Sequence, residues 1–208
     1  MQIGGRSFQK RDRCLRPIHY QRPAGNRTTL SPTGRTDLKR QRTHDFHTSL
    51  ALSNSYTDAP WWLDIYRRAF PSLISAVSVR DDGWAQRGGI DRVLTLACGR
   101  VFTIDEKDRT NDWPDILLEQ WSDEGRHKPG WVQKPLACDF IAYAFAPSRR
   151  CYLLPVAPLQ RAWRLYGRDW LRTLGQRRAR NRGHVSASVP VPIDVLMRGM
   201  VVATLIAP

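Results

Sequence analysis

A predicted β-hairpin over residues 89–107 constrains the fold of this chain more than any other segment. Two runs of largely apolar and β-branched residues flank a turn that contains glycine, a pattern typical of paired antiparallel strands. The first run opens with Asp91, and the second reaches the acids Asp105 and Glu106 followed by Lys107. Because side chains alternate along a strand, we expect Asp105 and Lys107 on one face and Glu106 on the other.

The turn leaves two strand registers open. In a three-residue loop that ends with Gly99 in the left-handed region, Asp91 lies directly opposite Asp105 on the same face. A two-residue loop would place Asp91 opposite Glu106 and separate the acids, because a shift of one residue reverses every side chain. Glycine at the last loop position favours the three-residue loop.

Two directly opposed carboxylates repel each other. At ~4 Å and an effective dielectric constant of about 20, the repulsion amounts to roughly 4 kcal/mol. A shared proton, the ammonium of Lys107 or a divalent cation could offset it. Oxygen ligands from two or three groups suit Mg²⁺ or Mn²⁺, and a neighbouring lysine could then position an attacking water or stabilise charge on a phosphate.

Asp91, followed after thirteen residues by Asp105-Glu106-Lys107 on the partner strand, resembles the core of the PD-(D/E)XK nuclease superfamily. The surrounding segments 86–92 and 105–109 also resemble small phage and prophage proteins of that superfamily, and the likeness covers about residues 60–175. It implies a restriction-endonuclease-like fold in which Asp91 and Asp105 hold Mg²⁺. It also implies that Glu106 lends its backbone carbonyl to the metal, and that Lys107 assists the water or the transition state.

The pattern around the hairpin predicts an α/β (α+β) domain with a central mixed sheet, the hairpin at its core and helices on its sides. Apolar periodicity and Pro/Gly punctuation define the other elements. We expect helices over 58–70, 158–174 and 192–200, and strands over 73–80, 115–121, 139–145, 151–156 and 185–191. The two near-continuous apolar runs, 139–145 and 151–156, fit central strands covered on both faces.

Two further acids have two readings each. Asp64 is either the acid that the superfamily often carries on its first helix or a surface residue paired with Arg68 four positions later. Glu119 is an additional metal ligand if its strand neighbours the hairpin, and otherwise an acid at a strand end.

The formal net charge of +14 over 208 residues favours an acidic partner, with nucleic acid, in particular DNA, as the first candidate. Residues 1–50 hold eleven Lys and Arg against three Asp, and such a composition predicts a disordered basic segment over 1–55 before a nuclease-like domain over 56–208. The segment is either an arm that follows a phosphate backbone or an extension from a start site called too early.

Arginines recur on one face of the helix predicted over 158–174 and continue in a run beyond it. Arginine binds phosphate in a bidentate manner, so this set is the predicted nucleic-acid contact, with a solvated helix face as the alternative. The residues are Arg161, Arg164, Arg168, Arg172, Arg177, Arg178, Arg180 and Arg182.

Other functional classes lack their motifs. The chain has no P-loop, no GxGxxG after a strand and no HExxH, and no apolar run has the length of a membrane helix. Its four scattered cysteines favour a reducing, cytoplasmic setting. The leading hypothesis is an Mg²⁺- or Mn²⁺-dependent nuclease that hydrolyses phosphodiester bonds in DNA. The alternatives are a non-catalytic nucleic-acid-binding module on the same scaffold and a phage structural or interaction protein, with a homodimer left open.

Overall fold

The computed structural model describes residues 59–181 and 183–205. The basic segment predicted over 1–55 and the contact predicted for Arg182 lie outside these residues. Within them, no helix is long and apolar enough to cross a membrane.

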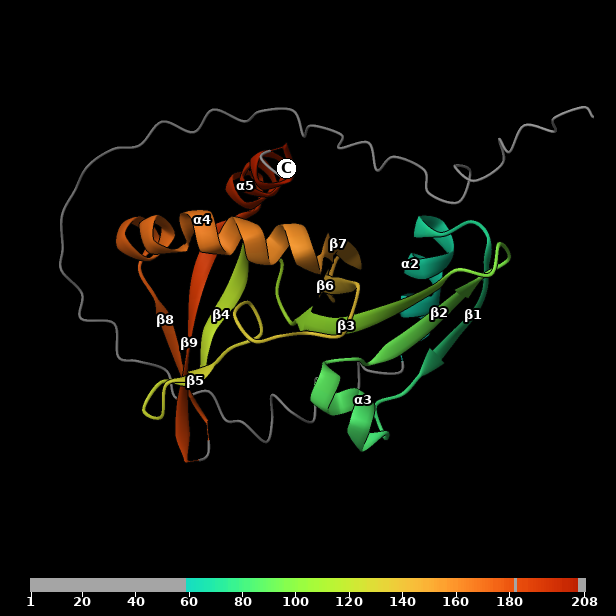
Figure 1. Cartoon of the computed structure of the whole chain (residues 1–208), viewed down its shortest axis with the longest axis horizontal. Coiled ribbons are helices and arrows are strands. Elements are labelled where there is room, and N and C mark those ends of the chain that lie inside the picture. Colours follow the sequence, from blue (N-terminus) through green and yellow to red (C-terminus); the bar gives the residue numbers. More distant parts are fainter. Residues whose placement is uncertain (1–58, 182, 206–208) are drawn as a thin grey trace, which may run out of the picture.

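The described chain forms a mixed α+β fold with two sheets and four helices among the described residues (Figure 1). In chain order the elements are α2 (Trp61–Ala69), β1 (Leu73–Ser78), α3 (Gly83–Gly88), β2 (Arg92–Leu96), β3 (Val101–Arg109), β4 (Asp115–Asp123), β5 (Lys128–Pro129), β6 (Phe140–Phe145), β7 (Arg150–Pro155), α4 (Val156–Leu174), β8 (Arg177–Asn181), β9 (His184–Pro192) and α5 (Ile193–Leu205).

The first sheet, called sheet A, has the strand order β1-β2-β3-β6-β7. Its β3–β6 pair is parallel, and its other pairs are antiparallel. The second sheet, sheet B, is antiparallel with the order β5-β4-β9-β8. Sheet A is the central mixed sheet expected from the sequence, with the hairpin at its core, and sheet B is a second sheet that the sequence did not predict.

The hairpin of β2 and β3 adopts the three-residue loop. Gly99 has φ +81°, and the amide of Leu96 donates to the carbonyl of Arg100 at 2.9 Å. Arg92 pairs with Ile104 in the ladder, so the next residue outward on each strand brings Asp91 opposite Asp105. The register favoured by the glycine position is confirmed.

The two faces of sheet A pack against different partners. On one face, α2 buries Trp62, Ile65 and Tyr66 against strand residues that include Leu94 and Ile104. This spacing of apolar residues is the reason that the segment is a helix with one buried side. The even-numbered residues of β3 therefore face α2, and its odd-numbered residues face the opposite layer.

The opposite face packs against α4 and sheet B. Ile141, Tyr143 and Phe145 of β6 join one buried cluster with Trp163 of α4 and Val189 of β9, and Figure 1 shows α4 lying across sheet B with α5 beyond it. All of β6 after its first residue is buried, which confirms a central strand covered on both faces. The same expectation is wrong for β7, which is an edge strand with mostly half-buried residues.

Helix α3 was not expected, although its signals are present in the sequence. Asp82 caps it by accepting from the amides of Trp84 at 2.7 Å and Ala85 at 3.1 Å, and Gly89 ends it with φ +69°. An aspartate before a helix and a left-handed glycine after it are common terminators. The helix matters for function because it leads directly into Asp91.

Candidate metal-binding and catalytic site

The centre of the candidate site, called the acid notch, consists of Asp91, Asp105 and Lys107. The amide of Asp91 donates to the carbonyl of Ile104 at 2.8 Å, which extends the β2–β3 ladder by one residue. The Oδ2 atom of Asp91 accepts from the amide of Glu106 at 2.7 Å. These two bonds fix the Asp91 carboxylate beside the Asp105 carboxylate, as the predicted register requires.

Burial differs across the acid notch. The side chain of Asp105 is 4% exposed, that of Asp91 19% and that of Lys107 33%. Burial raises the pKa of Asp105 to about 6; the ion pair with Lys107 opposes the rise and the Asp91 carboxyl adds to it. The buried carboxyl of Asp105 thus holds its proton more tightly than an exposed aspartic acid does.

Lys107 carries the positive charge of the acid notch. Its ammonium pairs directly with the Asp105 carboxylate. Burial by itself would lower the pKa of Lys107, but Asp105, Asp91 and Glu119 raise it above its ordinary value. The lysine is therefore an ammonium ion at neutral pH in this arrangement.

Glu106 faces the other side of β3, as the strand alternation predicts. Its carboxylate accepts from the Tyr66 hydroxyl at 2.6 Å, from Arg80 at 2.8 Å and from Arg92 Nε at 2.6 Å. These three donors occupy the Glu106 carboxylate. Its backbone carbonyl is the group that the family resemblance implies as a metal ligand. Arg80 also reaches across to Asp91 Oδ1 at 3.6 Å.

The turn after α3 lies against the acid notch. A Cβ atom added to Gly89 would lie 2.8 Å from Leu136 and 3.8 Å from Oδ2 of Asp105. Because Gly89 also has φ +69°, a side chain there would be both strained and crowded. Glycine at this position lets the backbone approach the buried carboxylate.

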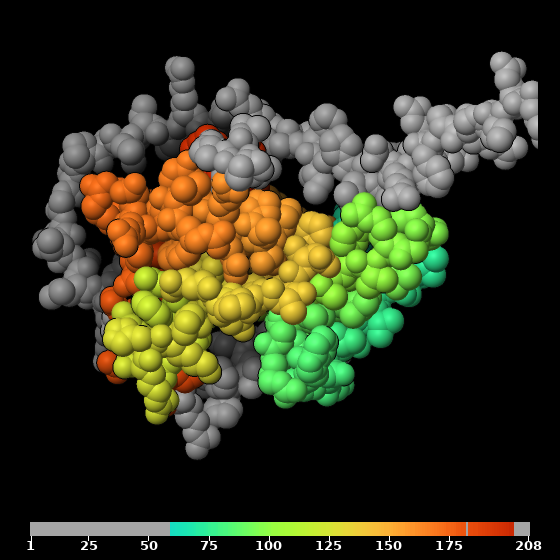
Figure 2. Space-filling view, viewed as in Figure 1, coloured from blue at the N-terminus to red at the C-terminus, as the bar shows by residue number. Residues whose placement is uncertain are grey.

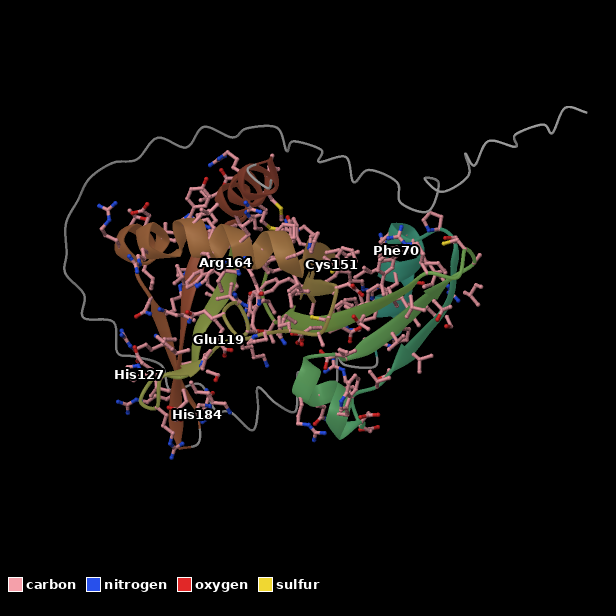
Figure 3. The ribbon with its side chains drawn as sticks, in the orientation of Figure 1. Phe70, Glu119, His127, Cys151, Arg164 and His184 are labelled. Carbon is pink, nitrogen blue, oxygen red and sulfur yellow. The ribbon has the colours of Figure 1, made fainter. Side chains whose placement is uncertain are left out.

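Glu119 comes from sheet B, so its strand does not neighbour the hairpin in a sheet. A β-bulge lies between Glu119 and Trp121, and such bulges reorient side chains. The amide of Trp131 donates to Glu119 Oε2 at 3.3 Å. Burial raises the pKa of Glu119, whereas that amide and the charges of Lys107, Lys134 and His184 lower it. Glu119 thus interacts electrostatically with the acid notch, and Figure 3 shows it on the half of the molecule that also carries His184.

The donors of the acid notch fit a hard divalent cation. Among residues 59–181 and 183–205, no group of three or more His, Cys, Asp or Glu side chains could together hold a metal ion. Asp91 and Asp105 form a pair of carboxylates, and burial is the main cause of the raised pKa of Asp105. Carboxylate and carbonyl oxygens completed by water are the ligands that Mg²⁺ prefers.

Asp64 does not contribute to the acid notch. It is exposed on α2, the helix that covers the opposite face of sheet A. Its carboxylate lies 4.0 Å from Arg67, and Arg68 Nε donates to the backbone carbonyl of Asp64 at 3.3 Å. The expected carboxylate pair with Arg68 is therefore wrong, and the surface reading of Asp64 holds.

Several arginines of the predicted contact set have acidic partners. Arg177 pairs with Asp115 at 3.2 Å, Arg178 with Glu124 at 2.7 Å and Arg172 with Asp169 at 3.2 Å. The run after α4 is not a loose extension, because Arg177 to Asn181 form β8, the edge strand of sheet B.

Three members of the set are exposed on the surface and make no ion pair with any residue in the described part of the chain: Arg164, Arg168 and Arg180. Arg161 is half-buried. Of the eight arginines in the predicted contact, these three are both exposed and without an acidic partner in the described part of the chain.

A groove between two lobes is visible on the face drawn in Figure 2. It lies between the lobe that carries β5 and the lobe that carries α3, with the segment around residues 131–139 above it and α4 higher on the same face. The two lobes belong to sheet B and to the α3–β2 side of sheet A. This face of the molecule therefore includes parts of both sheet A and sheet B.

Sequence reasoning missed Arg80, Arg92 and Tyr66 as supports of the site. Arg92 follows Asp91 directly, so strand alternation could have placed it on the face of Glu106. Arg80 and Tyr66 left no local signal, because their contacts with Glu106 join residues 26 and 40 positions apart.

Comparisons of the chain with protein-family models, with curated proteins and with solved structures give no match.

Proposed function

We propose that this protein is a metal-dependent nuclease that hydrolyses phosphodiester bonds in DNA, with a restriction-endonuclease-like fold of the PD-(D/E)XK superfamily. One observation carries the proposal. Asp91 and Asp105 oppose each other across the β2–β3 hairpin, and Lys107 pairs with Asp105 on the same face. The parallel pairing of β6 with β3 supports the fold assignment, because it sets the acidic strand at the centre of a mixed sheet.

In this proposal Asp91, Asp105 and the backbone carbonyl of Glu106 hold Mg²⁺ or Mn²⁺. The ion, when bound, supplies Lewis acidity and an activated water. Lys107, as an ammonium ion, stabilises negative charge that develops on the phosphate. Arg80 and Arg92 hold Glu106, and this keeps the β3 backbone in place under the acid notch.

DNA binding in this proposal uses the exposed arginines. Arg164 and Arg168 on α4 and Arg180 on β8 provide charge without competing acids in the described chain. Such contacts position a phosphate backbone irrespective of its sequence. We also propose a cytoplasmic location, which suits the free thiols of Cys138 and Cys151.

The direct test is cleavage of plasmid and linear DNA with Mg²⁺ or Mn²⁺ by the wild type and by Asp105→Asn and Lys107→Met. Each substitution is expected to lower the rate by at least about 10²-fold, the typical cost of removing a group that stabilises transition-state charge. Asp64→Asn, which changes an exposed acid outside the acid notch, is the matched control and is expected to cleave at the wild-type rate. Activity that survives both substitutions would contradict the proposal.

A second candidate is a nucleic-acid-binding or phage interaction module without turnover. It is favoured by the charge balance of the site, since Asp105 already pairs with Lys107 and Asp91 lies 3.6 Å from Arg80. DNA binding that weakens steeply with salt, without product at any divalent-ion concentration, would select this candidate.

A further inference from the structure

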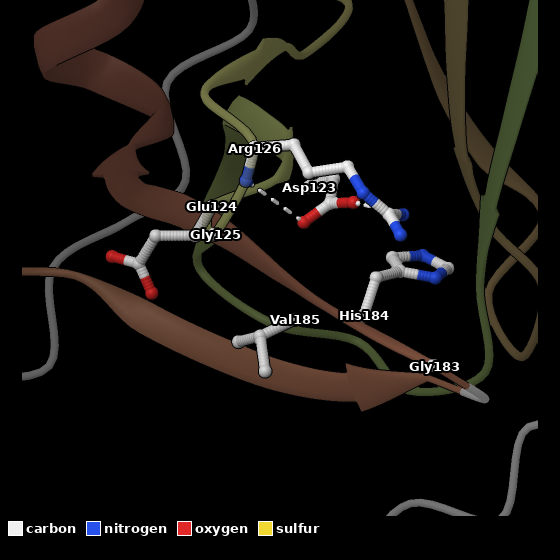
Figure 4. A pocket seen from close by; sticks show the side chains of 7 residues that line it. All are labelled: Asp123, Glu124, Gly125, Arg126, Gly183, His184 and Val185. Atoms are coloured by element: carbon white, nitrogen blue, oxygen red, sulfur yellow. Dashed lines mark hydrogen bonds and ion pairs between the residues drawn. The ribbon is translucent and has the colours of Figure 1, made fainter.

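Residues at the end of β4 and the start of β9 line a hollow in sheet B. The amide of Glu124, in the β4–β5 turn, donates to the carbonyl of Val185 on β9 at 2.7 Å. Between them lies a hollow of about 470 Å³, lined by residues 123–126 and 183–185 (Figure 4). This volume falls within the roughly 300–1,000 Å³ range of small-molecule sites.

The hollow presents flat nitrogen-rich groups over a buried acid. Asp123, 12% exposed at its side chain, accepts from the amide of Arg126 at 3.3 Å and from its guanidinium at 3.1 Å. Figure 4 shows the guanidinium of Arg126 and the ring of His184 on the same side of the hollow. Glu124 points to the other side, where Arg178 holds it in a bidentate pair.

Glu119 interacts electrostatically both with the acid notch and with a residue that lines this hollow. Lys107 interacts electrostatically with Glu119, and Glu119 interacts with His184. Glu119 and the hollow also share β4, which ends at Asp123. The hollow therefore lies at the end of the strand whose middle carries Glu119.

The groups at the hollow suit one nucleotide rather than a base pair. Guanidinium and imidazole planes stack on exposed base faces, and arginine also binds phosphate. The Asp123 carboxylate can accept hydrogen bonds from base N–H groups. In a continuous duplex each base face is covered by its stacked neighbours, so only an unpaired nucleotide can present its face and edge together.

We propose that the hollow between the β4–β5 turn and residues 183–185 is a subsite for one unpaired nucleotide of the DNA substrate. Arg126 and His184 stack on or bind this nucleotide, and Asp123 orients Arg126 from behind. The proposal rests on the nuclease function proposed above and makes its substrate class more specific. The substrate in this proposal is DNA that carries a single-stranded segment.

The test is DNA binding measured by fluorescence anisotropy in EDTA, which removes divalent ions and so prevents cleavage. The probes are a blunt duplex and the same duplex with a single-stranded tail. The wild type is expected to bind the tailed duplex more tightly. Arg126→Ala and His184→Ala are each expected to weaken binding of the tailed duplex about tenfold, the cost of losing one stacked base, with little effect on the blunt duplex.

Arg198→Ala is the matched control, because Arg198 is an exposed arginine on α5 that pairs with Asp194 at 2.9 Å. It is expected to bind both probes as the wild type does, and thermal unfolding of all variants checks that the fold is retained. If Arg126→Ala and His184→Ala weaken binding of both probes equally, the two residues contact only phosphate, and the nucleotide subsite is overturned. An absence of tail preference in the wild type would overturn it as well.

The two proposals fail in different ways. If Asp105-dependent cleavage occurs but the tail preference does not depend on Arg126, the nuclease proposal stands and the nucleotide subsite falls. If the tail preference depends on Arg126 but no divalent ion supports cleavage, the nuclease proposal falls.

Discussion

Replacing Asp105 by asparagine is expected to stabilise the protein at neutral pH. The carboxyl of Asp105 is almost fully buried, and its pKa in the folded chain is about 6, against an ordinary value of 3.8. A carboxyl with a raised pKa favours folding when protonated. That contribution is complete below about pH 4 and is lost as the pH rises through about 6. Asparagine keeps the size of the side chain and never ionises.

The size of the effect follows from the two pKa values. The difference between 3.8 and about 6 corresponds to about 3 kcal/mol at 1.36 kcal/mol per pKa unit. Asp105→Asn should therefore exceed the wild type by up to about 3 kcal/mol in free energy of unfolding at pH 7.5. At pH 4 the two proteins should differ by much less, because the wild-type carboxyl is then largely protonated.

The assay is urea unfolding of the wild type and Asp105→Asn in EDTA between pH 4 and pH 8, with Asp64→Asn as the exposed control. In a parallel series with Mg²⁺, a ligand at ten times its dissociation constant stabilises the folded state by about 1.4 kcal/mol. Mg²⁺ should therefore stabilise the wild type and leave Asp105→Asn unchanged. A wild type that is more stable than Asp105→Asn at pH 7.5 without metal would refute the reasoning, since the ion pair with Lys107 would then outweigh the cost of burial.

Three further outcomes can be measured on single variants. Gly130→Ala should lower the free energy of unfolding by about 3 kcal/mol, because the new Cβ would lie 2.2 Å from the carbonyl oxygen of Glu119. The loss should appear as a lower thermal midpoint, and an unchanged midpoint would contradict it. Tyr66→Phe should cost about 1–3 kcal/mol in urea unfolding, because the buried carboxylate on β3 loses a hydrogen bond of 2.6 Å; a cost near zero would show that its arginines suffice. Arg164→Ala should reduce the slope of log affinity against log salt by about 0.9 if the arginine contacts one phosphate, and an equal slope would remove it from the DNA contact.

The register of the hairpin could be predicted because one residue determines it. Gly99 at the last loop position accepts a positive φ, and the loop length then fixes every pair of the ladder, including the opposition of Asp91 and Asp105. The same alternation correctly separated the Glu106 carboxylate from the acid notch. These are local rules, and they apply wherever two strands are joined by a short turn.

The pairing of β4 could not be predicted in the same way. Its apolar run fits a strand of either sheet, and its partner β9 lies about seventy residues further on, as in the pair of Glu119 with Ser188. Nothing local distinguishes that choice from a place beside the hairpin. Strand β7 is a similar case. It has the apolar composition of a central strand, but it is the edge strand of sheet A because no further strand pairs with it. Long-range competition for partners decides both cases.

The two sheets are interleaved along the chain, and this has a consequence for synthesis on the ribosome. Strand β4 is encoded between β3 and β6, whereas β8 and β9, which pair in the same sheet, follow α4. A nascent polypeptide therefore exposes the acidic hairpin well before the partners of β4 have been translated. The arrangement of Lys107 and Glu119 is therefore completed only late in synthesis, and an unfinished chain carries Asp91, Asp105 and Lys107 without sheet B.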